Sequence, residues 1–133
     1  MKVKVYTDGG ARGNPGPAAY AFVVFENNIK IFQEGKYIGE TTNNVAEYTG
    51  VAKALEFLTT QIGVKEIDIF LDSLLVKEQL TGNYKIKHEN MKNFATQIKA
   101  LEKNFDHITY THISREKNKE ADALVNSTLD EIM

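Results

Sequence analysis

The first third of the chain alternates hydrophobic and polar positions, which is the pattern of half-buried β-strands. Residues 2–7 alternate in this way, and Asp8 follows directly on the polar face. Residues 18–26 and 29–34 are rich in aromatic and β-branched side chains and flank the pair Asn27-Asn28. Because asparagine tolerates the left-handed backbone of a tight turn, we predict that these two segments form a β-hairpin.

Apolar residues then recur every three or four positions, as they do along one face of an amphipathic helix. The first such stripe consists of Tyr48, Val51, Ala52, Leu55, Leu58 and Ile62. Gly63 follows the stripe as a C-terminal stop signal. Residues 65–71 alternate again and predict a strand, after which Ser73 is placed to cap a short helix that Gly82 ends.

Two further helices are predicted in the second half of the chain, one on each side of a strand over residues 107–113. The first spans about 89 to 105, with the stripe Met91, Phe94, Ile98, Leu101 and Phe105. We expect Asn118 to cap the second, with the stripe Ala121, Leu124, Val125, Thr128, Leu129 and Ile132. The element order predicts an α/β fold in which helices flank a mixed sheet.

Composition is that of an ordinary globular protein, with 42% hydrophobic and 26% charged residues. There is no repeat or linker, so we expect residues 1–133 to form a single domain. We also expect the protein to be a monomer. No apolar run approaches the roughly 20 residues that cross a bilayer, and the strand-like start has no apolar signal core. We therefore expect a cytoplasmic protein with no membrane partner. The absence of cysteine excludes disulfides and thiolate metal sites.

The distribution of charge bears on nucleic acids as partners. The formal net charge of −2 argues mildly against such a partner, because phosphate binding usually leaves a basic footprint. Between Lys77 and Lys103, however, there are six lysines and three acids, and Arg115, Lys117 and Lys119 follow. The local basic excess weakens the objection from net charge.

Four separated carboxylates, Asp8, Glu47, Asp72 and Asp122, are each expected at the beginning or end of a predicted element. Carboxylates that converge without basic partners repel one another, and a hard divalent cation removes that penalty. The four residues therefore predict a magnesium or manganese site.

The runs around these acids resemble those of type 1 ribonuclease H. The first is Thr7-Asp-Gly-Gly10 with Gly13-Asn-Pro-Gly16, and the second is Thr41-Thr-Asn-Asn-Val-Ala-Glu47. The third is Asp72-Ser73 after a strand, and the fourth is Asn118-Lys-Glu-Ala-Asp122. The similarity covers nearly all 133 residues and implies a ribonuclease H-like fold, a five-stranded mixed sheet with its first strand in the centre. In such a sheet, neighbouring strand ends would bring Asp8 and Asp72 together, and two helices would bring Glu47 and Asp122 to the same edge.

The resemblance also implies a metal-dependent endonuclease that hydrolyses the RNA strand of RNA–DNA hybrids and leaves 5′-phosphate and 3′-hydroxyl ends. Two Mg²⁺ or Mn²⁺ ions would be held in one site, with Asp8 bridging both, Glu47 and Asp72 on one ion and Asp122 on the other. Singly, each acid has an ordinary alternative: a turn residue, a surface helix residue or a first-turn carboxylate. The shared order of the four motifs outweighs these alternatives.

The same resemblance predicts which residues contact the substrate. Asn14, Asn43 and Asn44 would contact the minor groove, where the RNA strand displays 2′-hydroxyls that an amide can bind. Asn43 has the alternative role of capping the helix that carries Glu47. The residues assigned to the phosphates of the DNA strand are Thr42, Tyr84, Lys85 and Lys87. The two lysines have the alternative role of ordinary solvent-exposed surface residues.

Three features depart from the family pattern. Only residues 82–87 separate the two central helices, where many relatives carry a basic, aromatic-rich insertion that grips the hybrid. The loop before the last acid is shortened, and His112 follows the strand alternation, so Arg115 is predicted as the catalytic residue in place of the loop histidine of relatives. Position 74, often a polar minor-groove contact, is Leu74.

Two other functions remain open at this level. One is a DNA-acting nuclease of the same fold group, against which the run Thr42-Asn43-Asn44 argues. The other is a catalytically inactive hybrid-binding module, against which the presence of all four acids argues.

Overall fold

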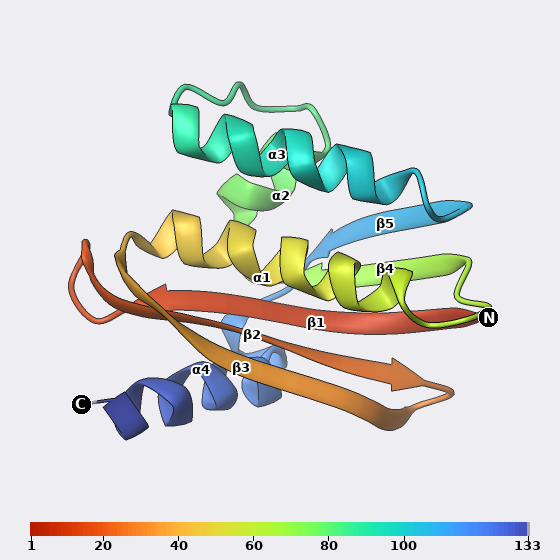
Figure 1. Cartoon of the computed structure of the whole chain (residues 1–133), viewed down its shortest axis with the longest axis horizontal. Helices are drawn as coiled ribbons and strands as arrows, with labels where there is room; N and C mark the ends of the chain where they lie inside the picture. Colours follow the sequence, from red (N-terminus) through yellow and green to blue (C-terminus); the bar gives the residue numbers. More distant parts are fainter. Residues whose placement is uncertain (133) are drawn as a thin grey trace.

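A central β-sheet organises the fold in the computed structural model, which describes residues 1–132 (Figure 1). The strands are β1 (Lys2–Ala11), β2 (Gly16–Glu26), β3 (Ile29–Thr41), β4 (Glu66–Leu71) and β5 (His107–His112). Their order in the sheet is β3-β2-β1-β4-β5. The first three strands pair antiparallel, whereas β4 pairs parallel with β1 and β5 pairs parallel with β4. The predicted mixed sheet with a central first strand is confirmed.

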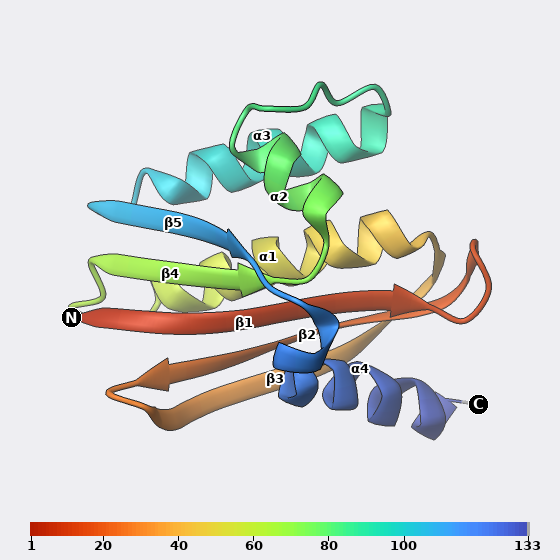
Figure 2. The same cartoon turned by 180° about the vertical axis from the view of Figure 1, so that it is seen from behind.

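Helices cover the two faces of this sheet unequally (Figures 1 and 2). The helices are α1 (Asn43–Thr59), α2 (Leu74–Leu80), α3 (Glu89–Glu102) and α4 (Lys119–Ile132), with a 3₁₀ turn, η1 (Arg115–Lys117), before α4. The first three lie on one face, and α4 packs on the other, against β1, β2 and β3. Because the connections from β1 to β4 and from β4 to β5 cross over through helices, the parallel strands end at the same edge of the sheet.

Alternation along β2 explains how one strand serves two cores. Tyr20, Phe22 and Val24 are buried in the larger hydrophobic cluster beneath α1, whereas Ala19 and Ala21 point to the opposite face and pack with residues of α4. Small side chains on that second face allow α4 to lie close to the sheet. The predicted alternation in β1 is confirmed as well, since Val3, Val5 and Thr7 are all buried.

The turns and caps largely follow local chemistry. Asn27 and Asn28 adopt positive φ angles of 51° and 64°, as the predicted hairpin requires. The Ser73 hydroxyl accepts a hydrogen bond from the backbone N–H of Val76 at 3.2 Å and caps α2, as expected. In the described residues 1–132, no helix has the length and apolar character needed to cross a membrane.

Four element boundaries were predicted wrongly. Strand β1 continues past Asp8 to Ala11, and β3 continues to Thr41, because pairing with β2 extends both strands beyond the hydrophobic alternation. Helix α1 ends at Thr59, so Ile62 lies beyond the helix and is 99% exposed instead of packing with the apolar stripe. Helix α3 likewise ends at Glu102, three residues before the predicted limit.

Candidate active site

Two of the predicted acids are brought together by the sheet itself. Strands β1 and β4 run parallel with Thr7 opposite Leu71, so the next residue of each chain segment, Asp8 and Asp72, emerges at the same level. Asp72 follows the last residue of β4, as predicted, but Asp8 lies within β1 and is buried. The close pairing of these carboxylates is therefore imposed by backbone hydrogen bonds of the sheet and does not depend on the side chains' own preferences.

Helix α1 supplies the third carboxylate from above the sheet. Its N-cap is Thr42, whose hydroxyl accepts a hydrogen bond from the backbone N–H of Val45 at 3.2 Å. Glu47 follows in the second turn and is only 8% exposed. The helix can approach this closely because Gly9 has no side chain: a Cβ atom there would lie 2.5 Å from the backbone nitrogen of Glu47.

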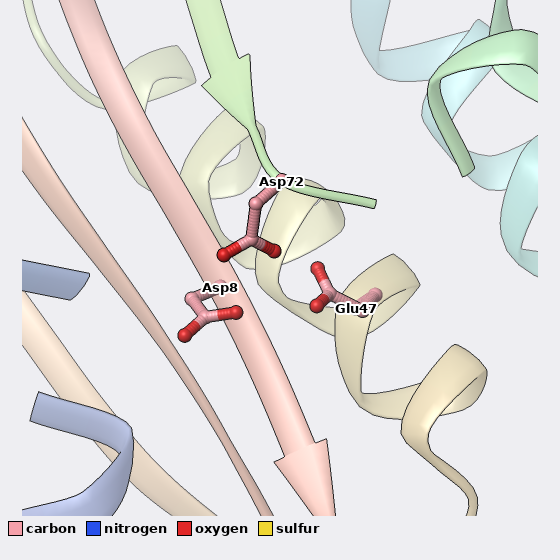
Figure 3. Close-up of side chains that lie close together, drawn as sticks. All are labelled: Asp8, Glu47 and Asp72. Carbon is pink, nitrogen blue, oxygen red and sulfur yellow. The ribbon is translucent and has the colours of Figure 1, made fainter. Parts of the chain in front are cut away.

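The carboxylates of Asp8, Glu47 and Asp72 point toward one another (Figure 3). One oxygen from each lies within 4.8 Å of the corresponding oxygens of the other two. Since all three are oxygen ligands of negative charge, they form a donor set suited to a hard divalent cation such as Mg²⁺ or Mn²⁺.

The pKa values and hydrogen bonds of these carboxylates also indicate that the site binds a divalent cation. Burial raises the pKa of Asp8 to about 7, and the neighbouring charge of Asp72 adds to the effect. Burial also raises the pKa of Glu47 well above its ordinary value, with further contributions from the charges of Asp8 and Asp72. In addition, Oε2 of Glu47 is buried without a hydrogen-bond partner among the described residues. A divalent cation would satisfy this oxygen and remove the repulsion, so the residues present fit the predicted metal site.

The fourth acid, Asp122, lies in the same hollow but outside the group of three. The hollow has a volume of about 480 Å³ and is lined by Asp8, Glu47, Asp72, Asp122 and Arg115 among others. Arg115 lies in η1, and its Nη2 is 3.4 Å from Oδ1 of Asp122. The arginine side chain lines this hollow and is 78% exposed, so its guanidinium is accessible to an anionic substrate.

The structure shows a different role for Asn118 from the predicted helix cap. Its side-chain Nδ2 donates to the backbone oxygen of Thr7 at 2.8 Å and lies 3.5 Å from Oδ2 of Asp72. The amide therefore bonds to the central strand, while its Oδ1 is buried without a hydrogen-bond partner among the described residues and so does not cap α4. Sequence analysis missed this contact, and the only local signal for it is the position of Asn118 in the run that ends at Asp122.

Two of the three predicted minor-groove asparagines, Asn14 and Asn43, are linked by a hydrogen bond. The Asn14 side-chain oxygen accepts from the backbone N–H of Asn43 at 3.0 Å, and the Asn43 side-chain oxygen accepts from the N–H of Ala11 at 2.8 Å. Asn43 therefore does not cap α1, a role that belongs to Thr42. Both asparagines are exposed, and Asn44 is half-buried in the first turn of α1.

The segment with Tyr84, Lys85 and Lys87 lies between α2 and α3, and all three side chains are exposed and outside the acidic hollow. The segment is nevertheless tied to the site through Gln79. Its Nε2 donates to the backbone oxygen of Lys85 at 3.2 Å, while its Oε1 accepts from the hydroxyl of Tyr48 at 2.6 Å. Tyr48 is the neighbour of Glu47, so this buried glutamine connects the loop to the helix that carries the acid.

The two departures at positions 74 and 112 have simple positions in the fold. Leu74 begins α2 and is 47% exposed. His112 is the last residue of β5 and is exposed. It lies near Glu78 of α2, whose pKa is lowered mainly by hydrogen bonds from Lys77 and Asn83 and to a smaller extent by the charge of His112. It does not line the acidic hollow, as the strand alternation predicted.

Comparison with known proteins identifies the class to which this fold and site belong. A family model described as "Reverse transcriptase-like" matches residues 6–128. Ribonuclease HI of Halobacterium salinarum is 39% identical over 131 residues, which are 98% of this chain and 65% of that protein. A crystal structure of RNase H1 from the same species has a TM-score of 0.93 at 37% identity and covers 98% of this chain and 99% of that chain. The chain belongs to the type 1 ribonuclease H family.

Two further relatives of this chain are one solved with a nucleic acid and one that is a longer protein. The structure titled LC11-RNase H1 in complex with RNA/DNA hybrid has a TM-score of 0.92 at 38% identity and covers 98% of both chains. A bifunctional protein of Mycobacterium tuberculosis is 39% identical over 132 residues, 98% of this chain. The present chain spans only 36% of the length of that mycobacterial protein.

Proposed function

We propose that this chain is a metal-dependent endonuclease that hydrolyses the RNA strand of RNA–DNA hybrids, leaving 5′-phosphate and 3′-hydroxyl ends. The observation that carries the proposal is the convergence of Asp8, Glu47 and Asp72 within 4.8 Å, in a hollow that also holds Asp122 and Arg115. The LC11-RNase H1 structure, solved with a bound RNA/DNA hybrid, supports the choice of substrate.

The four acids, Asp8, Glu47, Asp72 and Asp122, would hold two divalent cations. When bound, such a pair supplies Lewis-acid chemistry that activates water and stabilises charge on the leaving oxygen. The contribution of the protein is to hold negative charge in a fixed geometry. The sheet pairing beneath Asp8 and Asp72 and the close packing of α1 provide that rigidity.

Arg115 would act on the substrate itself. Its guanidinium lies 3.4 Å from Asp122 and is largely exposed, so it can reach a phosphate placed over the acids. A guanidinium stays protonated at all working pH values, and it would stabilise the negative charge that develops on the phosphate oxygens.

Recognition of RNA would fall to Asn14, Asn43 and Asn44. The oxygens of the first two amides are already bonded within the protein, which leaves the N–H groups of these exposed side chains for 2′-hydroxyls. Thr42, Tyr84, Lys85 and Lys87 would contact the phosphates of the DNA strand. Gln79 holds the loop that carries the last three.

One panel of substrates tests the proposal. The protein is incubated with labelled RNA–DNA hybrid, duplex DNA, duplex RNA and each single strand, in Mg²⁺, in Mn²⁺ and in chelator. We expect cleavage only of the RNA strand in the hybrid, dependent on the metal and blocked by 2′-O-methylation next to the cut. Equal cleavage of duplex DNA would instead assign the chain to DNA-acting nucleases of this fold group.

A single substitution separates recognition from folding in the same assay. Asn43→Asp keeps an oxygen that accepts from the N–H of Ala11 but removes the two amide donors. We expect unchanged thermal stability, because a carboxylate at the start of α1 is also favoured by the helix dipole. The KM for hybrid should rise by at least about 10-fold, because a hydrogen bond to substrate is lost and the added negative charge repels the phosphates of the hybrid. An unchanged KM would remove Asn43 from the recognition surface.

A further inference from the structure

We propose that Asn118 is a positioning residue that sets the spacing of the acids and thereby the affinity of the site for its divalent cations. The expected effect of Asn118 on catalysis rests on the proposed function. Its expected effect on cation binding does not, because cation binding can be measured without substrate. Asn118 is 1% exposed and lies between η1 and α4, directly before the helix that carries Asp122.

This one residue contacts the chain segments of three acids. Its Nδ2 donates at 2.8 Å to the backbone oxygen of Thr7, the residue before Asp8, and reaches Oδ2 of Asp72 at 3.5 Å. Its own backbone oxygen accepts from the N–H of Asp122 at 3.1 Å. The first contact joins residues 111 positions apart in the sequence, and it is buried.

The contact between Asn118 and Thr7 is needed because the acids are held in place in different ways. Asp8 and Asp72 are aligned by the β1–β4 pairing, but α4 has no strand register that places Asp122 relative to them. Other polar contacts between α4 and the sheet, such as Lys30 with Glu120 at 2.9 Å, join exposed side chains and are weakened by solvent. The buried bond from Asn118 is shielded from water, so it defines the position of the start of α4 more strongly.

The chemistry of the amide suits this place better than a charged group would. Both neighbours of Nδ2, the backbone oxygen of Thr7 and Oδ2 of Asp72, are acceptors, so together they fix the orientation of the amide. A neutral donor orients the carboxylate of Asp72 without supplying a positive charge that would compete with a cation. Residues that orient metal ligands in this way typically change metal affinity or activity by about 10- to 100-fold when removed.

The test compares Asn118→Ala and Asn118→Ser with the control Asn104→Ala. Asn104 is also an asparagine whose Nδ2 donates to a backbone oxygen, that of Leu101 at 3.0 Å, but it is exposed and does not line the acidic hollow. Binding of Mn²⁺ to the protein without nucleic acid is followed by the loss of the EPR signal of the free ion. Cleavage of hybrid is then measured as a function of Mn²⁺ concentration, with kcat and KM determined separately.

We expect Mn²⁺ binding to weaken by about 10- to 100-fold in Asn118→Ala and by less in Asn118→Ser, with no change in the control. The fall in kcat should be partly restored by added Mn²⁺, while the KM for hybrid stays within about threefold, because no substrate contact is removed. A folded variant that loses activity but binds Mn²⁺ normally would overturn the inference, and so would failure of both variants to fold. A wild-type protein that binds Mn²⁺ but does not cleave hybrid would refute the proposed function alone.

Discussion

Gly9 of β1 and Ala46 of α1 pack so closely that a Cβ atom on Gly9 would lie 2.3 Å from both the carbonyl carbon and the oxygen of Ala46. The contact is between two backbones, neither of which can move aside as a flexible side chain would. It brings the helix onto the central strand directly beside Asp8, and as a result the Glu47 carboxylate reaches the acid cluster. The glycine in the Thr-Asp-Gly-Gly run therefore has a packing role in addition to any turn preference.

Gly9→Ala should consequently destabilise the protein by about 3 kcal/mol or more, the upper range for overpacking, because the clash is with backbone. Gly10→Ala is the matched control. A Cβ atom at that position meets Val125 at 3.8 Å, which is ordinary van der Waals contact. Urea denaturation of both variants decides the point, and equal stability of the two would show that α1 can shift away from β1 without cost.

Asp72→Asn should leave the fold intact and reduce cleavage of hybrid by more than roughly 100-fold, since losing a ligand costs more than losing a group that merely orients one. The amide retains the shape of the carboxylate but cannot provide its charge. In chelator, the thermal stability should be unchanged or higher, because the charge of Asp72 contributes to the raised pKa of Asp8. Near wild-type cleavage in saturating Mg²⁺ would contradict the two-metal assignment.

The stability of the metal-free protein should fall as pH rises from 5 to 8. The folded-state pKa of Asp8, about 7, lies above its ordinary value of 3.8, so the folded protein binds the proton more tightly than the unfolded chain. This contribution to stability is fully present below pH 3.8 and is lost as pH rises through about 7. Glu47, with its pKa also raised, contributes with the same sign.

Thermal denaturation in chelator across this pH range measures that contribution, with Asp8→Asn as the reference that lacks the titrating group. Added Mg²⁺ should raise the Tm of the wild-type protein more at pH 8 than at pH 5, because a cation binds the deprotonated carboxylates. A stabilisation by Mg²⁺ that is the same at both pH values would contradict this account of the cluster.

Arg115→Ala should lower kcat by roughly 10- to 1,000-fold, the scale of one electrostatic contact to a transition state. The pH profile should keep its shape, because a guanidinium does not titrate in this range. His112→Ala should cost far less, since His112 ends β5 outside the acidic hollow. Both values of kcat are measured on one hybrid after circular dichroism confirms folding, and a severe loss at His112 with near-normal Arg115 would reverse the assignment.

Local patterns were sufficient to predict most of the secondary structure and the identity of the four acids. The alternation of Val3, Val5 and Thr7, the paired asparagines of the hairpin and the Ser73 cap are short-range effects, which depend on side-chain size and backbone preference at each position. Predictions failed at element ends, as at Ile62 and beyond Asp8, because helix termination and strand pairing there depend on neighbouring segments.

The acids and the order of the elements were thus determined by the sequence alone, while the tertiary structure decided how the site is held. Asn118 and Asn43 each offered a helix cap as the obvious local role, yet both bond to β1, 111 and 32 residues away. Gln79, which connects Tyr48 to the loop of Lys85, carries no sequence signal of its own. Such contacts depend on which backbone groups lie within hydrogen-bond distance of the side chain, and those positions are defined only when strand, helix and loop have been brought together.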